Sequence, residues 1–180
     1  MSADAMWVFG YGSLIWNPEF APVERTLATL PAYRRSFCMR SIHHRGTVDA
    51  PGLVLALDEA PEALCRGVAF RVAPGQEQET LDALRLRELV SSAYLERRVP
   101  LRLDDGRAVE AYAYVIDQSH VQYCRDLSLE DQARIIGDAV GARGRNDEYL
   151  FNTSMHLNDL GIGDPELDWL ADRVASFKAR

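Results

Sequence analysis

Short apolar runs separated by turn residues dominate the first two thirds of the chain. Such runs are typical of β-strands, and we predict strands at residues 6–11, 25–30, 33–41, 52–58, 66–72, 94–103 and 108–116. Asp105-Gly106 lies between the last two runs and predicts a tight hairpin turn. Residues 77–89 differ, because Leu81 and Leu84 recur at helical spacing, and we predict a helix there.

The last third of the chain has a helical pattern instead. Ser128 and Asp131 resemble a capping box, and the apolar stripe behind it is Leu129, Ala133, Ile136 and Val140. A second helix is predicted at residues 147–160. Asp164-Pro165 predicts the start of a third, which runs to residue 177 with an inward face of Trp169, Leu170, Val174 and Phe177.

This order of elements predicts an α+β fold. Strands come first, then one helix, two more strands and finally helices, which does not fit regular βαβ alternation. We therefore expect a mixed, barrel-like sheet of five to seven strands with flanking helices. Residues 1–180 are predicted to form one domain, with a helical extension over about residues 126–180.

Composition narrows the class of protein. With 180 residues, 47% hydrophobic and 26% charged, the chain is long enough and apolar enough for a core of its own. Twenty basic and 27 acidic residues give a net charge of −7, which argues against a surface for nucleic acid or anionic membranes. The start has no signal-peptide pattern and no apolar run is long enough to span a bilayer, so we predict a cytoplasmic protein.

The three cysteines do not indicate a cysteine-based site. Their number is odd and no Cys-x-x-Cys occurs, so neither a disulfide framework nor a zinc knuckle is predicted. Cys38 and Cys65 lie in apolar runs, where we expect buried thiols. No two histidines have metal-ligand spacing either, and no metal is predicted.

The first apolar run ends in a glycine-rich loop, residues 6–16 reading MWVFGYGSLIW. Gly10 and Gly12 permit backbone conformations that other residues avoid, and Ser13 with its neighbouring amides would face a ligand at the end of the strand. A carboxylate or an oxyanion would suit such amides. The same pattern also fits an ordinary strand followed by a turn. A dinucleotide fingerprint, a P-loop and a hydrolase elbow are excluded by spacing.

Glu88 is the candidate for acid–base chemistry. It lies at the end of the predicted helix among apolar residues, where desolvation and the helix dipole would raise the pKa of a carboxyl above the usual Glu value of roughly 4.3. A raised pKa suits a general base. The alternative is a solvated glutamate paired with Arg85 or Arg87.

Two further candidates for substrate binding each have an alternative without a functional role. His43-His44-Arg45 is the basic cluster of this acidic chain; it would hold a substrate carboxylate, or it is a polar surface loop. Tyr149 would send its hydroxyl into a pocket, or it is a half-buried aromatic residue with its hydroxyl in water.

Taken in order, these pieces resemble the ChaC family of γ-glutamylcyclotransferases, and in particular its bacterial branch. The resemblance covers nearly the whole chain. Its motifs are VFGYGSLIW at 8–16, HRGT at 44–47 followed by PG at 51–52, GVAF at 67–70, Arg87-Glu88 followed by Tyr94, and Asn146 followed by Tyr149-Leu150. One departure is Ser92-Ala93, where the family often has Gly.

The resemblance implies a γ-glutamylcyclotransferase-like fold and a lyase that cleaves glutathione to 5-oxoproline and cysteinylglycine. Glu88 would be the general acid/base. The γ-glutamyl group would be held by Gly10, Tyr11, Gly12, Ser13, Leu14 and Ile15. Arg45 and Tyr149 are further hypothetical substrate contacts. The substrate's own α-amine attacks its γ-carbonyl, so no cofactor is required and the expected partner is a small molecule.

Two alternatives stay open. A cyclotransferase acting on γ-glutamyl-amino acids or γ-glutamylamines would share the γ-glutamyl end and hence the same loop. A non-catalytic module that binds a small molecule would need no acid at position 88.

Overall fold

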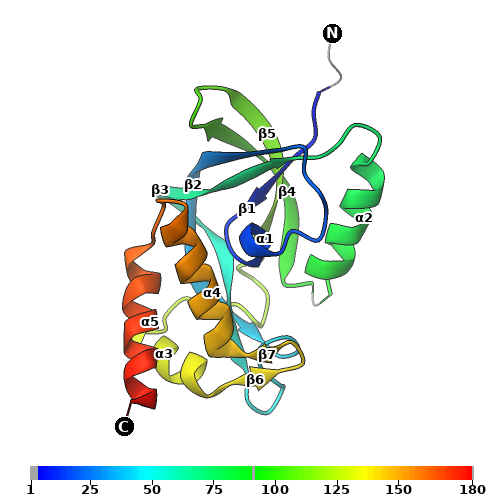
Figure 1. Ribbon diagram of the computed structural model, residues 1–180. Helices are drawn as coiled ribbons and strands as arrows, with labels where there is room; N and C mark the ends of the chain where they lie inside the picture. The colour runs from blue at the N-terminus through cyan, green and yellow to red at the C-terminus, as the bar shows by residue number, and fades with distance from the viewer. Residues whose placement is uncertain (1–3, 91, 180) are drawn as a thin grey trace. The chain divides into compact units, whose positions relative to one another are not determined.

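The computed structural model describes residues 4–90 and 92–179. Residues 1–3, part of the segment on which the signal-peptide prediction rests, lie outside these ranges. The chain divides into two compact units, one from residues up to 35 together with 56–120, and one from 36–55 together with residues from 121 onward. Two long strands, β2 (Glu24–Ser41) and β3 (Gly52–Arg71), contribute to both units (Figure 1). The prediction of a single domain stays a prediction.

The first unit is built on a closed, mixed barrel. Its strand order is β1-β3-β2-β4-β5, in which β1 is Trp7–Gly10, β4 is Tyr94–Leu103 and β5 is Ala108–Ile116. Strand β5 runs parallel to β1 and β3, whereas the pairs β1–β3, β2–β4 and β4–β5 are antiparallel. The predicted Asp105-Gly106 turn joins β4 to β5, and Gly106 has a φ of 95°. The predicted α+β fold with a barrel-like mixed sheet is confirmed.

The two long strands were each predicted as two short ones. Strand β2 continues through Pro31 and through Ala32, which has a φ of 66°. Strand β3 continues through residues 59–64, which are mostly exposed and therefore show no apolar run. Apolar patterning reports burial, whereas a strand is defined by its backbone pairing, so an exposed stretch of strand is missed.

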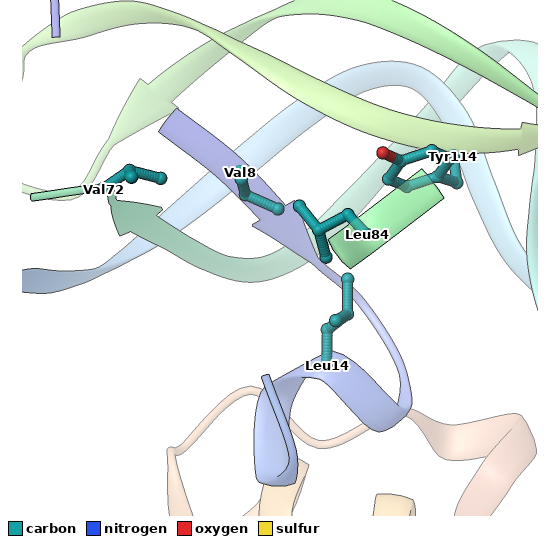
Figure 2. Close-up of a cluster of buried hydrophobic side chains, with 5 residues drawn as sticks. All are labelled: Val8, Leu14, Val72, Leu84 and Tyr114. Carbon is teal, nitrogen blue, oxygen red and sulfur yellow. The ribbon is translucent and has the colours of Figure 1, made fainter. Parts of the chain in front are cut away.

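One helix of the first unit packs on the barrel beside the glycine-rich loop. A cluster of buried side chains comprises Val8, Leu14, Val72, Leu84 and Tyr114 (Figure 2). Leu84 belongs to α2 (Glu77–Glu88) and Leu14 to the short helix α1 (Ser13–Trp16), and the two side chains point toward one another. This cluster therefore fixes α2 against α1 and β1.

The second unit is mainly helical. It contains α3 (Leu129–Asp138), α4 (Asn146–Asp159) and α5 (Pro165–Lys178), which pack on one another, and a small hairpin of β6 (Val140–Gly141) and β7 (Gly144–Arg145). Both predicted caps are confirmed. Ser128 Oγ accepts a hydrogen bond from Asp131 N at 3.1 Å, and Asp164 caps the helix that begins at Pro165. Within the described residues, no helix is long and apolar enough to cross a membrane.

Two residues predicted to face inward are exposed. Val140 is 55% exposed because α3 ends at Asp138 and leaves this residue in β6. Trp169 is 42% exposed because the buried face of α5 is formed by Leu167, Leu170 and Val174, about one third of a turn away.

Candidate active site

The glycine-rich loop begins where β1 and β3 approach closely. Gly10 ends β1 and pairs with Val68 of β3. A Cβ atom on Gly10 would lie 2.8 Å from Phe70 Cε2, and one on Gly67 would overlap the carbonyl oxygen of Gly10. Neither Gly10 nor Gly12 has a positive φ. The loop thus needs glycine at position 10 for space, whereas Gly12, with a φ of −144° and a ψ of −125°, has backbone angles that residues with a Cβ atom rarely adopt, as expected.

Tyr11 is held from both of its ends. Its hydroxyl donates to the carbonyl oxygen of Tyr114 at 2.9 Å, and its own carbonyl oxygen accepts from Arg35 Nε at 2.6 Å. Arg35 is buried and also donates to the carbonyl oxygen of Arg66. The backbone of the loop is therefore fixed to two strands of the barrel before any ligand binds.

Arg87, on α2, clamps the other side of this loop. Its Nη2 donates to Ser13 Oγ at 2.7 Å, and its Nη1 donates to the carbonyl oxygen of Asn17 at 2.5 Å. Glu19 adds an ion pair at 3.6 Å. The Arg87 side chain is only 7% exposed. One guanidinium thus joins both ends of α1 to the end of α2.

Glu88 is the last residue of α2, and its side chain is 15% exposed. It follows Leu84 by one helical turn, so it lies on the face of α2 that packs toward α1. Its Oε1 lies 3.4 Å from Arg87 Nε. The sequence offered a desolvated carboxylate or an ion pair with arginine as alternatives; the structure combines them. Arg87 thus places a positive charge beside the Glu88 carboxylate.

A network of polar side chains lies beside Glu88. Tyr114 OH donates to Glu96 Oε2 at 3.1 Å, and Arg85 binds both oxygens of Glu96 at 2.9 Å. Burial raises the pKa of Tyr114, and the negative charges of Glu96 and Glu88 raise it further, so the phenol keeps its proton at neutral pH. Arg85 holds the pKa of Glu96 below its usual value despite partial burial.

Arg45 and Tyr149 lie together in the second unit. The Arg45 guanidinium lies over the Tyr149 ring at 5.6 Å, and its Nη1 donates to the carbonyl oxygen of Arg145 at 3.1 Å. Burial lowers the pKa of Arg45. Tyr149 is 7% exposed, and its hydroxyl accepts a hydrogen bond from Leu55 N at 3.2 Å. The alternative of a half-buried tyrosine with its hydroxyl in water is therefore wrong.

The segment that carries Arg45 is held by close glycine packing. A Cβ atom on Gly46 would overlap the backbone of Gly52, and one on Gly141 would overlap the backbone of His44. Asn146 adds a pair of hydrogen bonds with the backbone of Leu53, at 2.8 and 2.7 Å. These contacts give a structural reason for the HRGT, PG and Asn146 motifs.

The predicted site residues therefore fall into two groups. Residues 10–15 and Glu88 lie in the first unit, and Arg45 and Tyr149 lie in the second. A cavity of about 410 Å³ in the first unit lies between residues 19–21, the end of β3 and the first two turns of α2, and none of the predicted site residues lines it. Among residues 4–90 and 92–179, no three His, Cys, Asp or Glu side chains converge as metal ligands.

Sequence reasoning missed Arg35 and Tyr114. Both lie within strands, Arg35 beside the exposed Arg34 and Tyr114 within an apolar run, so nothing local distinguished them. Their contacts with Tyr11 span 24 and 103 residues of sequence. Only closure of the barrel brings these residues together.

Residues 6–177 match the family model of the ChaC-like proteins. This chain belongs to the ChaC family. The glutathione-specific γ-glutamylcyclotransferase of Escherichia coli K12 is 38% identical over 173 residues, which cover 96% of this chain and 73% of that protein. γ-Glutamylcyclotransferase 2-3 of Arabidopsis thaliana is 36% identical over 178 residues, which cover 94% and 88%.

The fold agrees with this membership of the ChaC family. A crystal structure of a yeast γ-glutamyl cyclotransferase specific to glutathione matches with a TM-score of 0.87 at 22% identity, covering 97% of each chain. The predicted resemblance to the ChaC family, on the motifs quoted above, is confirmed.

Proposed function

We propose that this protein is a γ-glutamylcyclotransferase that converts glutathione to 5-oxoproline and cysteinylglycine, with Glu88 as its general acid/base. The names of the Escherichia coli and Arabidopsis relatives support the activity, and the name of the Escherichia coli protein supports the substrate. The observation that carries the mechanism is the mostly buried Glu88 carboxylate beside Arg87. Arg87 also donates a hydrogen bond to Ser13 of the glycine-rich loop.

The proposed reaction is an internal displacement. The α-amine of the γ-glutamyl residue attacks its own γ-carbonyl carbon, a five-membered lactam forms, and the bond to the cysteine nitrogen breaks. Since nucleophile and electrophile belong to one molecule, correct folding of the substrate alone is equivalent to an effective concentration of roughly 10⁵ M or more. Neither water nor an external nucleophile enters the products.

Proton transfer is the task proposed for Glu88. The α-amine is protonated near neutral pH and must lose a proton before it attacks, and the departing cysteine nitrogen must gain one. One carboxylate can perform both transfers in turn. Arg87, whose Nε lies 3.4 Å from Glu88 Oε1, holds a positive charge beside this carboxylate.

Residues 10–15 are proposed to hold the γ-glutamyl group. Arg35 fixes the Tyr11 carbonyl and Arg87 fixes the Ser13 hydroxyl, so the loop is rigid before substrate arrives. Such preorganisation supports stabilisation of the charge that develops on the γ-carbonyl oxygen. Substrate contacts by Arg45 and Tyr149, and a cytoplasmic location, stay predictions.

The test is formation of 5-oxoproline from glutathione by wild-type protein and by Glu88→Gln, an isosteric change that removes the base. Glu79→Gln, an exposed position on the same helix, is the matched control. We expect the wild type and the control to form product at similar rates, and Glu88→Gln to lose at least about 10²-fold in kcat. Near wild-type turnover by Glu88→Gln would remove this residue from the mechanism.

The same assay separates the alternatives. Turnover of γ-glutamyl-alanine above that of glutathione would identify a cyclotransferase for γ-glutamyl-amino acids. Glutathione binding by calorimetry without lactam formation would identify a binding module. If the protein neither converts these substrates nor binds glutathione, the proposal is overturned altogether.

A further inference from the structure

We propose that Cys38 and Cys124 form a disulfide when this protein meets a low-molecular-weight disulfide. All three cysteines of the chain are thiols in the structure. Cys38 and Cys124 both belong to the second unit, and Cys65 belongs to the first. This inference is independent of the proposed enzymatic function.

Backbone pairing places the two cysteines opposite each other. Met39 and Tyr123 form an antiparallel β-bridge. The bridge is flanked by hydrogen bonds from Cys124 N to the Cys38 carbonyl oxygen at 2.7 Å and from Arg40 N to the Gln122 carbonyl oxygen at 2.8 Å. Cys38 precedes Met39 and Cys124 follows Tyr123. Because the two segments are antiparallel, Cys38 therefore lies opposite Cys124.

Directly opposed residues of an antiparallel pair extend their side chains on the same face, with Cα atoms about 5.5 Å apart at a hydrogen-bonded position. Disulfides most often join Cα atoms about 5.5–6 Å apart. The Cβ atoms of such a pair are about 4.5–5.5 Å apart, and those of a disulfide are about 3.5–4.5 Å apart. The two sulfur atoms can therefore bond once the side chains rotate and the backbone closes by about 1 Å.

The pairing is also held in register by a side chain. Gln122 is buried, and its Nε2 donates to the Arg40 carbonyl oxygen at 2.8 Å. This bond adds to the two backbone bonds that flank the bridge. The cysteines are thus kept opposite each other while one of them reacts.

The two sulfurs differ in access, which sets the order of the steps. Cys38 is 2% exposed, whereas Cys124 is partly exposed. In the first step the Cys124 thiolate attacks one sulfur of the small disulfide, forms a mixed disulfide and releases one small thiol. In the second step the Cys38 thiolate attacks the Cys124 sulfur and displaces the other small thiol. The protein loses two hydrogens in total, and the small disulfide is reduced to two thiols.

The new bond would also stabilise the fold. It closes a long loop of the chain, from the end of β2 to the segment that precedes α3. Cross-links over long loops restrict the unfolded chain most. We expect the unfolding temperature to rise by about 5 °C or more. Burial raises the pKa of Cys124, so little thiolate is present at neutral pH and we expect oxidation over hours.

The experiment incubates the folded full-length protein with bis(2-hydroxyethyl) disulfide, which lacks a γ-glutamyl group and so cannot enter the proposed reaction. Remaining thiols are then alkylated, and the protein is analysed by intact mass and by non-reducing peptide mapping. We expect a mass loss of about 2 Da, a linked Cys38–Cys124 peptide pair and alkylation at Cys65 alone. A reductant should reverse all three results.

Three variants complete the design. Cys65→Ser should form the disulfide as the wild type does, whereas Cys38→Ser should stop at a mixed disulfide on Cys124, and Cys124→Ser should resist oxidation. Alkylation of both Cys38 and Cys124 in wild-type protein after prolonged treatment would overturn the proposal. A stable mixed disulfide on wild-type Cys124, or a linkage that involves Cys65, would overturn it equally.

Discussion

Arg87 Nη2 donates a hydrogen bond to Ser13 Oγ at 2.7 Å, although the two residues are 74 positions apart. The same guanidinium lies 3.4 Å from Glu88 Oε1. The proposed acid/base and the proposed substrate loop thus share one positioning residue. A change at Arg87 is expected to disturb both the charge next to the carboxylate and the position of the loop.

Substitution of Arg87 should lower catalytic activity strongly in a protein that still folds. For Arg87→Met we expect kcat/KM with glutathione to fall by about 10²-fold, because the loop and Glu88 both lose their support. Arg87→Lys restores the charge but only part of the contacts, and it should recover part of the activity. Arg85→Met is the matched control on the same helix, since Arg85 binds Glu96 instead. Equal activity of Arg87→Met and Arg85→Met would contradict this role.

Gly67 should tolerate alanine less well than Gly10 does. The added methyl group at Gly67 meets the backbone oxygen of Gly10, which cannot move away, whereas at Gly10 it meets the edge of the Phe70 ring at 2.8 Å, which can tilt. We expect losses in the free energy of unfolding of about 3 kcal/mol for Gly67→Ala and about 1–2 kcal/mol for Gly10→Ala. Urea denaturation followed by circular dichroism measures both. A larger loss for Gly10→Ala would show that the ring is the more rigid neighbour.

Ser92→Gly should stabilise the protein. Ser92 has a φ of 59°, in the left-handed region where a side chain is unfavourable and glycine is not. This is also part of the Ser92-Ala93 pair at which the chain departs from the glycine often found in the family. After allowance for the greater freedom of glycine in the unfolded chain, we expect a gain of about 0.5–1 kcal/mol. Ser92→Ala keeps the Cβ atom and should show no gain, so equal stability of the two variants would refute the explanation.

The Arg85–Glu96 pair should make stability depend on pH in the acid range. Arg85 lowers the pKa of Glu96 from 4.5, so the folded state binds a proton less readily than the unfolded state does. The pair therefore contributes stability above about pH 5, and this contribution is lost as the pH falls through the lower folded-state pKa. Glu96→Gln should be less stable than wild type at pH 7, with the difference shrinking below about pH 4. A difference that is constant with pH would exclude this origin.

Helix starts and turns that depend on neighbouring residues alone were predicted correctly. Asp164-Pro165 and Ser128 begin helices because their side chains cap the backbone amides that follow directly. The Asp105-Gly106 turn likewise depends on neighbouring residues alone. The full lengths of β2 and β3 were missed because they depend on pairing with distant strands, which leaves no apolar mark on exposed residues.

The candidate site was likewise predictable only in part. Glu88 and the loop at residues 10–15 carry motifs, and their order along the chain indicated the family. The link between them through Arg87 was visible only as one of two possible partners of Glu88. The contacts of Arg35 and Tyr114 with Tyr11 arise from barrel closure, and a single sequence has no pattern that reports such closure.

The apolar contact of Leu84 with the cluster around Leu14 has a consequence for inactivation. Helix α2 bears Arg87 and Glu88 at its last turn, so any partial opening that releases Leu84 withdraws both side chains at once. Under the proposed mechanism, catalytic competence therefore depends on the survival of one twelve-residue helix. Turnover should then cease on warming when the amides of α2 become exchangeable, even while the barrel strands still resist exchange.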